Sequence, residues 1–219
     1  MTGITAVSLM SGGPDALLAS HMARDEADTV ELLFIDYDQH ALRREMDCAH
    51  RCAEFLGANL MVTKVDIFAQ LQVSGLVAEE SRSTVTRPVS EYVPFRNTVF
   101  LSLATAVAEA RGAQRLYVGA TGAPWVTPDN SPEYFRRMGS VIEQGTLPET
   151  TIQIVAPLNL YDKRRVISES LDRGLPLGST WSCHNESDIP CDECGNCQSR
   201  RAAFEALGVT DPVSVAAPQ

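Results

Sequence analysis

An apolar stretch at residues 6–10 runs directly into a pair of glycines, and this junction constrains the fold more than any other feature. Paired glycines let the backbone approach a ligand closely, and their N–H groups can point at phosphate oxygens. A proline follows, as is common in a first helical turn, and the start of a helix adds a positive dipole. The pattern predicts a strand, a phosphate-binding loop and a helix, with these loop residues: Ser11, Gly12, Gly13, Pro14, Asp15 and Ala16.

Apolar runs alternate with helical periodicity along most of the chain, which predicts an α/β fold with a doubly wound parallel sheet. The expected strands are residues 6–10, 30–35, 60–65, 115–119 and 151–155. The expected helices are residues 14–27, 42–56, 97–111, 133–144 and 163–173. The irregular stretches are residues 68–94 and 120–132. Ligands of open parallel sheets bind outside the carboxyl ends of the strands, so the second stretch is well placed for substrate.

Length and charge limit the classes of function. The 219 residues are 44% hydrophobic, which allows one domain with a substantial core and a small appendage. No run approaches the roughly 20 apolar residues that span a bilayer, and the first residues lack the features of a secretory signal, so we expect a cytoplasmic protein without a membrane partner. A net charge of −10, from 28 acidic and 18 basic side chains, disfavours nucleic acid as a partner.

Four of the six cysteines are closely spaced near the C-terminus as C-x7-C-x2-C-x2-C, which predicts a metal site. The predicted ligands are Cys183, Cys191, Cys194 and Cys197. Four thiolates can close a tetrahedral Zn²⁺ site that stabilises the segment and does no chemistry. An iron–sulfur cluster is the main alternative, although Gln198-Ser199 follows the last cysteine where a ferredoxin-type run would continue with a cysteine and a proline. His184 is a second alternative, as a substitute ligand.

The domain organisation follows from these patterns. We expect a nucleotide-binding α/β domain at residues 1–175 and a small zinc-bound helical segment at 176–210. A flexible tail is expected at 211–219, where the composition shifts to Ala, Pro and Val.

Several segments, taken in order, carry a resemblance to known proteins. The Ser-Gly-Gly-Pro-Asp loop resembles that of the PP-loop ATP pyrophosphatase superfamily. Asp36-Tyr37-Asp38-Gln39-His40, Tyr92-Val93-Pro94-Phe95-Arg96-Asn97 and Thr180-Trp181-Ser182-Cys183 resemble segments of the 7-cyano-7-deazaguanine synthase family of the queuosine pathway. The similarity spans nearly the whole chain.

This resemblance implies a Rossmann-like fold of the adenine nucleotide alpha hydrolase type and an ATP-dependent carbon–nitrogen ligase. Adenylation of 7-carboxy-7-deazaguanine, followed by ammonia, gives the amide, and a second activation gives 7-cyano-7-deazaguanine. Mg²⁺ and a homodimer are also implied. The candidate catalytic residues are Asp15, Arg96 and Lys163. The candidate substrate-binding residues are Asp36, Gln39, Phe95, Arg96, Asn97, Trp125 and Asp129.

Two departures from the family pattern leave alternatives open. Ala16 replaces the last serine of the phosphate loop, and Asn130-Ser131 replace a cysteine and an arginine after Asp129. A divergent member could stop at the amide, or transfer the acyl group to another amine, such as a metabolite or a protein N-terminus. A non-catalytic nucleotide-binding subunit is a further alternative. Transfer RNA thiolation is disfavoured by the acidic charge balance and by the absence of a separate RNA-binding domain.

Overall fold

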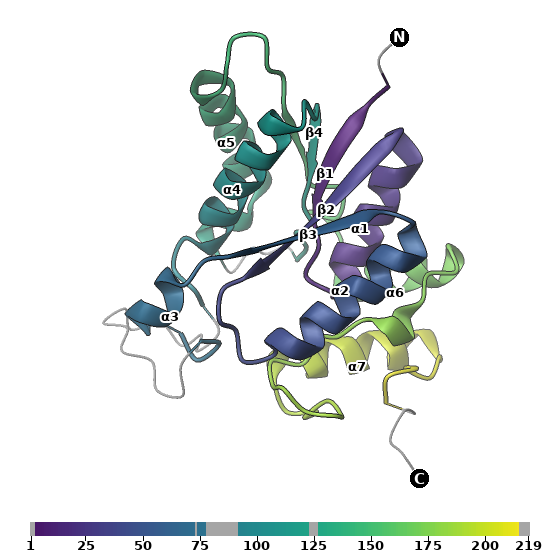
Figure 1. The fold of residues 1–219 in the computed structure, drawn as a ribbon. Coiled ribbons are helices and arrows are strands. Elements are labelled where there is room, and N and C mark those ends of the chain that lie inside the picture. Colours follow the sequence, from purple (N-terminus) through teal and green to yellow (C-terminus); the bar gives the residue numbers. More distant parts are fainter. Residues whose placement is uncertain (1–2, 73, 78–91, 123–126, 215–219) are drawn as a thin grey trace.

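The computed structural model describes residues 3–72, 74–77, 92–122 and 127–214. A five-stranded sheet in the order β3-β2-β1-β4-β5 forms its centre, and all neighbouring strands are parallel (Figure 1). The strands are β1 Thr5–Leu9, β2 Thr29–Asp36, β3 Asn59–Lys64, β4 Arg115–Tyr117 and β5 Gln153–Val155. The helices are α1 Pro14–Glu26, α2 Leu42–Leu56, α3 Ile67–Leu71, α4 Arg96–Ala110, α5 Pro132–Gly145, α6 Lys163–Asp172 and α7 Gly195–Leu207.

Helices cover both faces of the sheet, which confirms the doubly wound architecture (Figure 1). Side chains alternate along β1, so Ala6 packs with α1, α2 and α6, whereas Val7 packs with α4 and α5. Because both faces of the central strands are buried, these strands have continuous apolar sequences instead of alternating ones. None of the helices in the described ranges combines the length and apolar character that crossing a membrane requires.

The expected element boundaries differ from the observed ones at a few places. The fourth strand ends at Tyr117 and not at Gly119. Gly119 lies against the predicted phosphate loop, where a Cβ would be 2.9 Å from the Asp15 carbonyl oxygen. The stretch 68–94, expected to be irregular, begins within the short helix α3. Its residues 73 and 78–91 lie outside the described part.

A buried arginine fastens the C-terminal segment. Arg200, on α7, is 4% exposed, and its guanidinium donates to the Asp211 carboxylate, with Nε–Oδ2 at 2.6 Å. It also donates to the Thr180 hydroxyl at 2.9 Å and to the Leu177 carbonyl at 2.9 Å. The expected tail at 211–219 therefore begins with packed residues, since Asp211 pairs with Arg200 and Val213 packs beside the cysteine cluster.

Loss of the Arg200 side chain should destabilise the fold. Arg200→Leu leaves the Asp211 carboxylate, which is only 14% exposed, without its cationic partner, so we expect the free energy of unfolding to fall by about 3 kcal/mol in urea titrations. Arg201→Leu is the matched control, because Arg201 is exposed and its ion pairs are 3.9 and 4.0 Å long. That change should cost less than about 1 kcal/mol. Equal losses of unfolding free energy in the two variants would contradict the stabilising role of Arg200.

Candidate active site and metal centre

The predicted phosphate loop connects β1 to α1 and is tightly enclosed. Gly12 has a φ of +79°, and a Cβ there would lie 2.3 Å from the backbone oxygen of Glu45 on α2. The Gly12 carbonyl accepts a hydrogen bond from the Trp181 N–H at 2.9 Å. Helix α1 begins at Pro14, with Gly13 as its N-cap. The loop backbone thus lies at the positive end of a helix dipole, as anion binding requires.

The structure brings Asp15 and Lys163 together from the first turns of α1 and α6. Lys163 Nζ donates to Asp15 Oδ2 at 2.5 Å, and the two side chains are 19% and 23% exposed. The other carboxylate oxygen, Asp15 Oδ1, is buried and has no hydrogen-bond partner in the described part of the chain. A buried carboxylate oxygen without a partner can accept a cation or a ligand donor, so the position fits a Mg²⁺ ligand.

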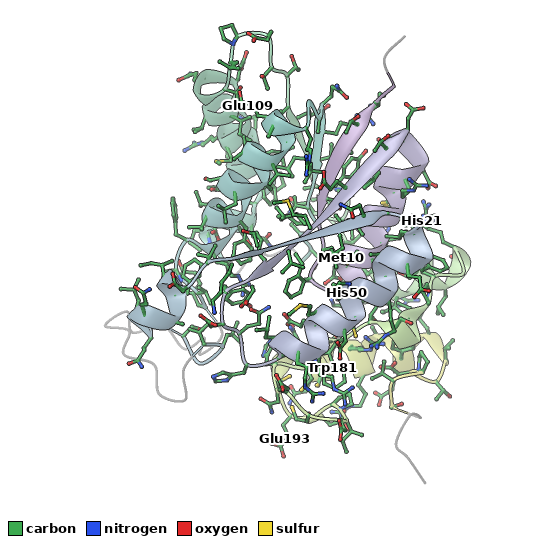
Figure 2. All side chains as sticks on the ribbon, in the orientation of Figure 1. Met10, His21, His50, Glu109, Trp181 and Glu193 are labelled. Atoms are coloured by element: carbon green, nitrogen blue, oxygen red, sulfur yellow. The ribbon has the colours of Figure 1, made fainter. Side chains whose placement is uncertain are left out.

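A cavity of about 540 Å³ opens at the carboxyl ends of β1, β2 and β4, where open parallel sheets bind their ligands. Ser11, Asp15, Arg96 and Asn97 line it, together with Met10, which lies at the centre of the molecule (Figure 2). A larger hollow of about 1040 Å³ lies beside α5 and the edge strand β5, but none of the predicted site residues line it. The smaller cavity is therefore the candidate active site.

Hydrogen-bonded side chains from the segment after β2 and from the first turns of α2 and α4 form one wall of this cavity. Arg96 Nη1 donates to the Tyr37 hydroxyl at 3.2 Å, and its guanidinium lies 5.6 Å from the centre of the Tyr37 ring. The Gln39 side chain is buried: its Oε1 accepts from the Tyr37 N–H at 3.0 Å, and its Nε2 donates to Glu45 Oε2 at 2.8 Å. Both ends of Gln39 are thus engaged within the protein.

Glu45 is a cavity residue that the sequence did not single out. It lies in the first turn of α2, among other charged residues of an amphipathic helix, and only its contact with Gln39 distinguishes it. Burial raises the pKa of Glu45, while the Gln39 hydrogen bond and the Arg96 charge lower it in part. Burial also raises the pKa of Tyr37, and the charge of Arg96 opposes that shift.

Other predicted substrate residues have structural contacts. Asp129 is 5% exposed, and its Oδ2 accepts from the backbone N–H of Asn97 at 2.9 Å, which caps α4. Asp36 Oδ1 accepts from the Asp38 N–H at 2.9 Å, and Phe95 is 60% exposed with a left-handed φ of +59°. Asp36, Phe95 and Asp129 do not line the cavity. Trp125 lies outside the described residues.

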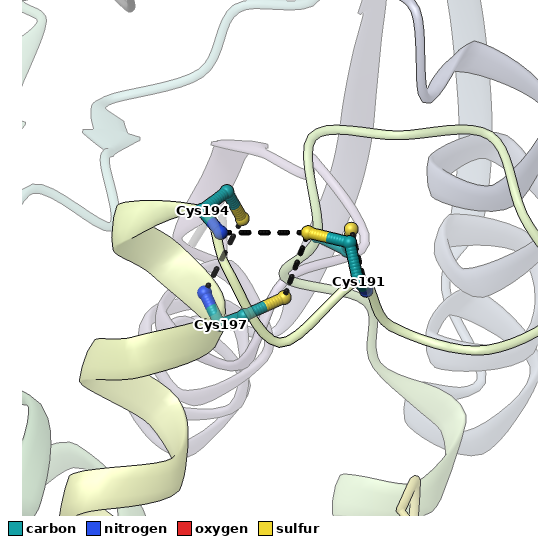
Figure 3. A group of neighbouring side chains, drawn as sticks. Cys191, Cys194 and Cys197 are labelled. Atoms are coloured by element: carbon teal, nitrogen blue, oxygen red, sulfur yellow. Dashed lines mark hydrogen bonds between the residues drawn. The ribbon is translucent and has the colours of Figure 1, made fainter.

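The four predicted metal ligands converge, with all their sulfur atoms within 4.8 Å of one another. Figure 3 shows three of them, with Cys191 Sγ and Cys197 Sγ 4.0 Å apart. A tetrahedral Zn²⁺ with bonds of about 2.3 Å needs sulfur separations of about 3.8 Å, so the set fits zinc after small adjustments. Backbone N–H groups of Cys194 and Glu193 lower the pKa of Cys191 to about 7, which favours a thiolate. Four converging sulfur atoms are enough for tetrahedral coordination, so the site does not require His184 as a ligand.

The cysteine segment also forms part of the cavity wall. His184 and Asn196, each next to a cysteine of the cluster, line the cavity, and their side-chain nitrogens are 2.7 Å apart. Trp181 packs between α2 and this segment (Figure 2), and Arg44 lies 5.4 Å from its ring centre. The cysteine cluster and the candidate active site are therefore neighbours.

The enclosed loop leads to a direct test. Gly12→Ala introduces both a left-handed non-glycine residue and a backbone clash, so we expect the free energy of unfolding to fall by more than about 2 kcal/mol, with loss of ATP binding. Gly139→Ala, on α5, is the control, because a Cβ there meets nothing within 4 Å. Thermal unfolding and calorimetric ATP titration measure both effects. A Gly12→Ala protein as stable as wild type would contradict the described packing.

Comparison with known proteins gives a consistent result. The model of the family described as "Queuosine biosynthesis protein QueC" matches residues 5–208. A 7-cyano-7-deazaguanine synthase of Campylobacter curvus is 35% identical over 218 residues, covering 96% of this chain and 97% of that protein. One of Methanospirillum hungatei is 32% identical over 215 residues, covering 95% and 98%.

Solved structures agree on the fold. An NMN synthetase from Francisella tularensis superimposes with a TM-score of 0.52 at 12% identity, covering 94% of this chain and 77% of that one. A 4-thiouridine synthetase in complex with RNA and ATP gives 0.51 at 21% identity, covering 78% and 40%. Such low identities establish the fold alone. The family match, together with the Campylobacter and Methanospirillum relatives, shows that this chain belongs to the QueC family of queuosine biosynthesis proteins.

Proposed function

We propose that this chain is an ATP-dependent carbon–nitrogen ligase that converts 7-carboxy-7-deazaguanine and ammonia into 7-cyano-7-deazaguanine, releasing AMP and pyrophosphate. The observation that carries the proposal is the meeting of the phosphate loop and Arg96 in one cavity at the carboxyl ends of the strands. The names of the curated relatives point to the same product.

The proposed chemistry starts from a carboxylate, which is a poor electrophile until one of its oxygens becomes part of a leaving group. In the first step, a substrate oxygen attacks the α-phosphorus of ATP, and pyrophosphate leaves. Ammonia then attacks the acyl carbon, and AMP and one proton depart, which leaves the amide. A second ATP activates the amide oxygen in the same way, and loss of AMP and of both nitrogen-bound protons gives the nitrile.

The residues of the cavity supply charge for these steps. The loop N–H groups and the α1 dipole stabilise the phosphates, and Lys163 lies one contact away through Asp15. Arg96, which lines the same cavity, can bind a carboxylate through its planar guanidinium. Asp15 would hold Mg²⁺, which offsets the charge of the departing pyrophosphate.

The two departures from the family pattern favour a second candidate, a member that stops at the amide or uses another amine. Ala16 is buried and offers no hydroxyl to phosphate, although the backbone donors remain. The Asn130 amide donates to the Thr121 carbonyl at 3.1 Å, and Ser131 Oγ caps α5 by accepting from the Tyr134 N–H at 3.1 Å. Asn130 and Ser131 thus have structural contacts here, and Ser131 offers no cationic side chain. The homodimer and the cytoplasmic location stay predictions.

The reaction can be tested directly. Incubation with 7-carboxy-7-deazaguanine, Mg-ATP and ammonium should give the nitrile by mass spectrometry, with two AMP and two pyrophosphate per nitrile. Accumulation of the amide alone would support the second candidate. Absence of AMP release with the acid and with the amide, while ATP still binds, would exclude both and support a nucleotide-binding subunit.

We also propose that the four cysteines bind one structural Zn²⁺. Elemental analysis should find about one zinc per chain. Cys191→Ser should lose the metal and, because His184 and Asn196 are held by this segment, also weaken substrate binding. Cys48→Ala is the control, since Cys48 is a buried thiol outside the four-sulfur cluster and its loss should leave zinc content unchanged. Iron with acid-labile sulfide would overturn the proposal.

A further inference from the structure

Glu45 has no part in the chemistry described above, yet it lines the active-site cavity. One of its carboxylate oxygens, Oε2, is held by the Gln39 amide at 2.8 Å, and Gln39 is itself fixed by the Tyr37 N–H and only 5% exposed. No donor from the described residues reaches the other oxygen, Oε1. A buried amide thus fixes a carboxylate at the cavity wall and leaves acceptor capacity unused, since each oxygen has two lone pairs.

The surroundings of this carboxylate suit a flat heterocycle. Tyr37 and Phe100 line the same cavity, with ring centres 5.4 Å apart. Aromatic side chains bind planar ligands through stacking and edge contacts, and pockets combine such apolar walls with a few fixed polar groups. Arg96, bonded to the Tyr37 hydroxyl, adds a positive charge beside this wall.

The charge of Glu45 decides which heterocycle fits. The Gln39 N–H donor and the nearby charge of Arg96 favour the ionised form of Glu45. In that form the carboxylate accepts hydrogen bonds and donates none, so it needs a ligand edge that presents N–H donors. A guanine-type ring has two adjacent donors, the N–H of the pyrimidine ring and the 2-amino group. The corresponding edge of adenine has a ring nitrogen lone pair beside its amino group, which a carboxylate repels.

We propose that Glu45 recognises the ring N–H and 2-amino group of the deazaguanine substrate, with Gln39 as the residue that positions it. This inference rests on the proposed function, because it assigns one end of that substrate. Glu45 is the specificity-determining residue that separates the deazaguanine site from the adenine site.

The test compares two substrates with wild-type protein: 7-carboxy-7-deazaguanine and 7-carboxy-7-deazahypoxanthine, which lacks the 2-amino group. Loss of a hydrogen bond to a charged group should lower kcat/KM for AMP release about 10- to 100-fold. Glu45→Gln should lower kcat/KM for the amino substrate by a similar factor and change that for the analogue little. The preference should then fall below about threefold.

Glu54→Gln is the matched control, since Glu54 is on the same helix and exposed, and the preference should stay at the wild-type value. Equal wild-type activity on both substrates would overturn the inference without any variant, even if Glu45→Gln failed to fold. An equal loss on both substrates in Glu45→Gln, or a change confined to the KM of ATP, Mg²⁺ or ammonium, would also overturn it. If the wild-type protein released no AMP with 7-carboxy-7-deazaguanine and none with the analogue, that separate result would refute the proposed function itself.

Discussion

The contact between Gly12 and the first turn of α2 is the packing constraint on which the site depends. The phosphate loop passes so close to the Glu45 backbone that no side chain fits between them. On its other side the loop meets Gly119 after β4, where the clearance is similarly small. Two glycines from distant parts of the chain thus let three elements meet around one turn. Packing against these neighbours holds the loop in shape, and a rigid loop is preorganised for the ligand it is predicted to bind.

Much of the architecture could be predicted because it depends on local pattern. The sequence predicts helix α2 at residues 42–56, where it is observed, since its apolar stripe is clear and Gly57 closes it with a left-handed φ of +58°. The central strands β1 and β2 are recognisable because burial on both faces requires continuous apolar runs. Helix α7 was foreseen only as part of a zinc-bound helical segment, because cysteines and turn residues obscure its start.

The candidate site was less predictable than the fold, because roles in a cavity depend on contacts between distant segments. Asp129 has the right residue type for substrate binding, but its carboxylate caps α4 from 32 positions away in the chain. Glu45 is one of several charges on α2, and no spacing in the sequence marks it as facing inward. Lys163 was expected to act, but its pairing with Asp15 across 148 positions follows only from the way α1 and α6 pack.

One backbone hydrogen bond links the two functional parts of the molecule. The Trp181 N–H, two residues before the first cysteine, donates to the Gly12 carbonyl inside the phosphate loop. If metal binding orders the cysteine segment, it also orders this donor, and the loop then loses less conformational freedom when a nucleotide arrives. Linkage requires the converse as well: occupancy of the loop would raise the affinity of the thiolates for their metal by the same factor. The cysteine segment and the predicted phosphate loop are then thermodynamically coupled, so the cellular supply of metal and that of nucleotide would act on one shared equilibrium.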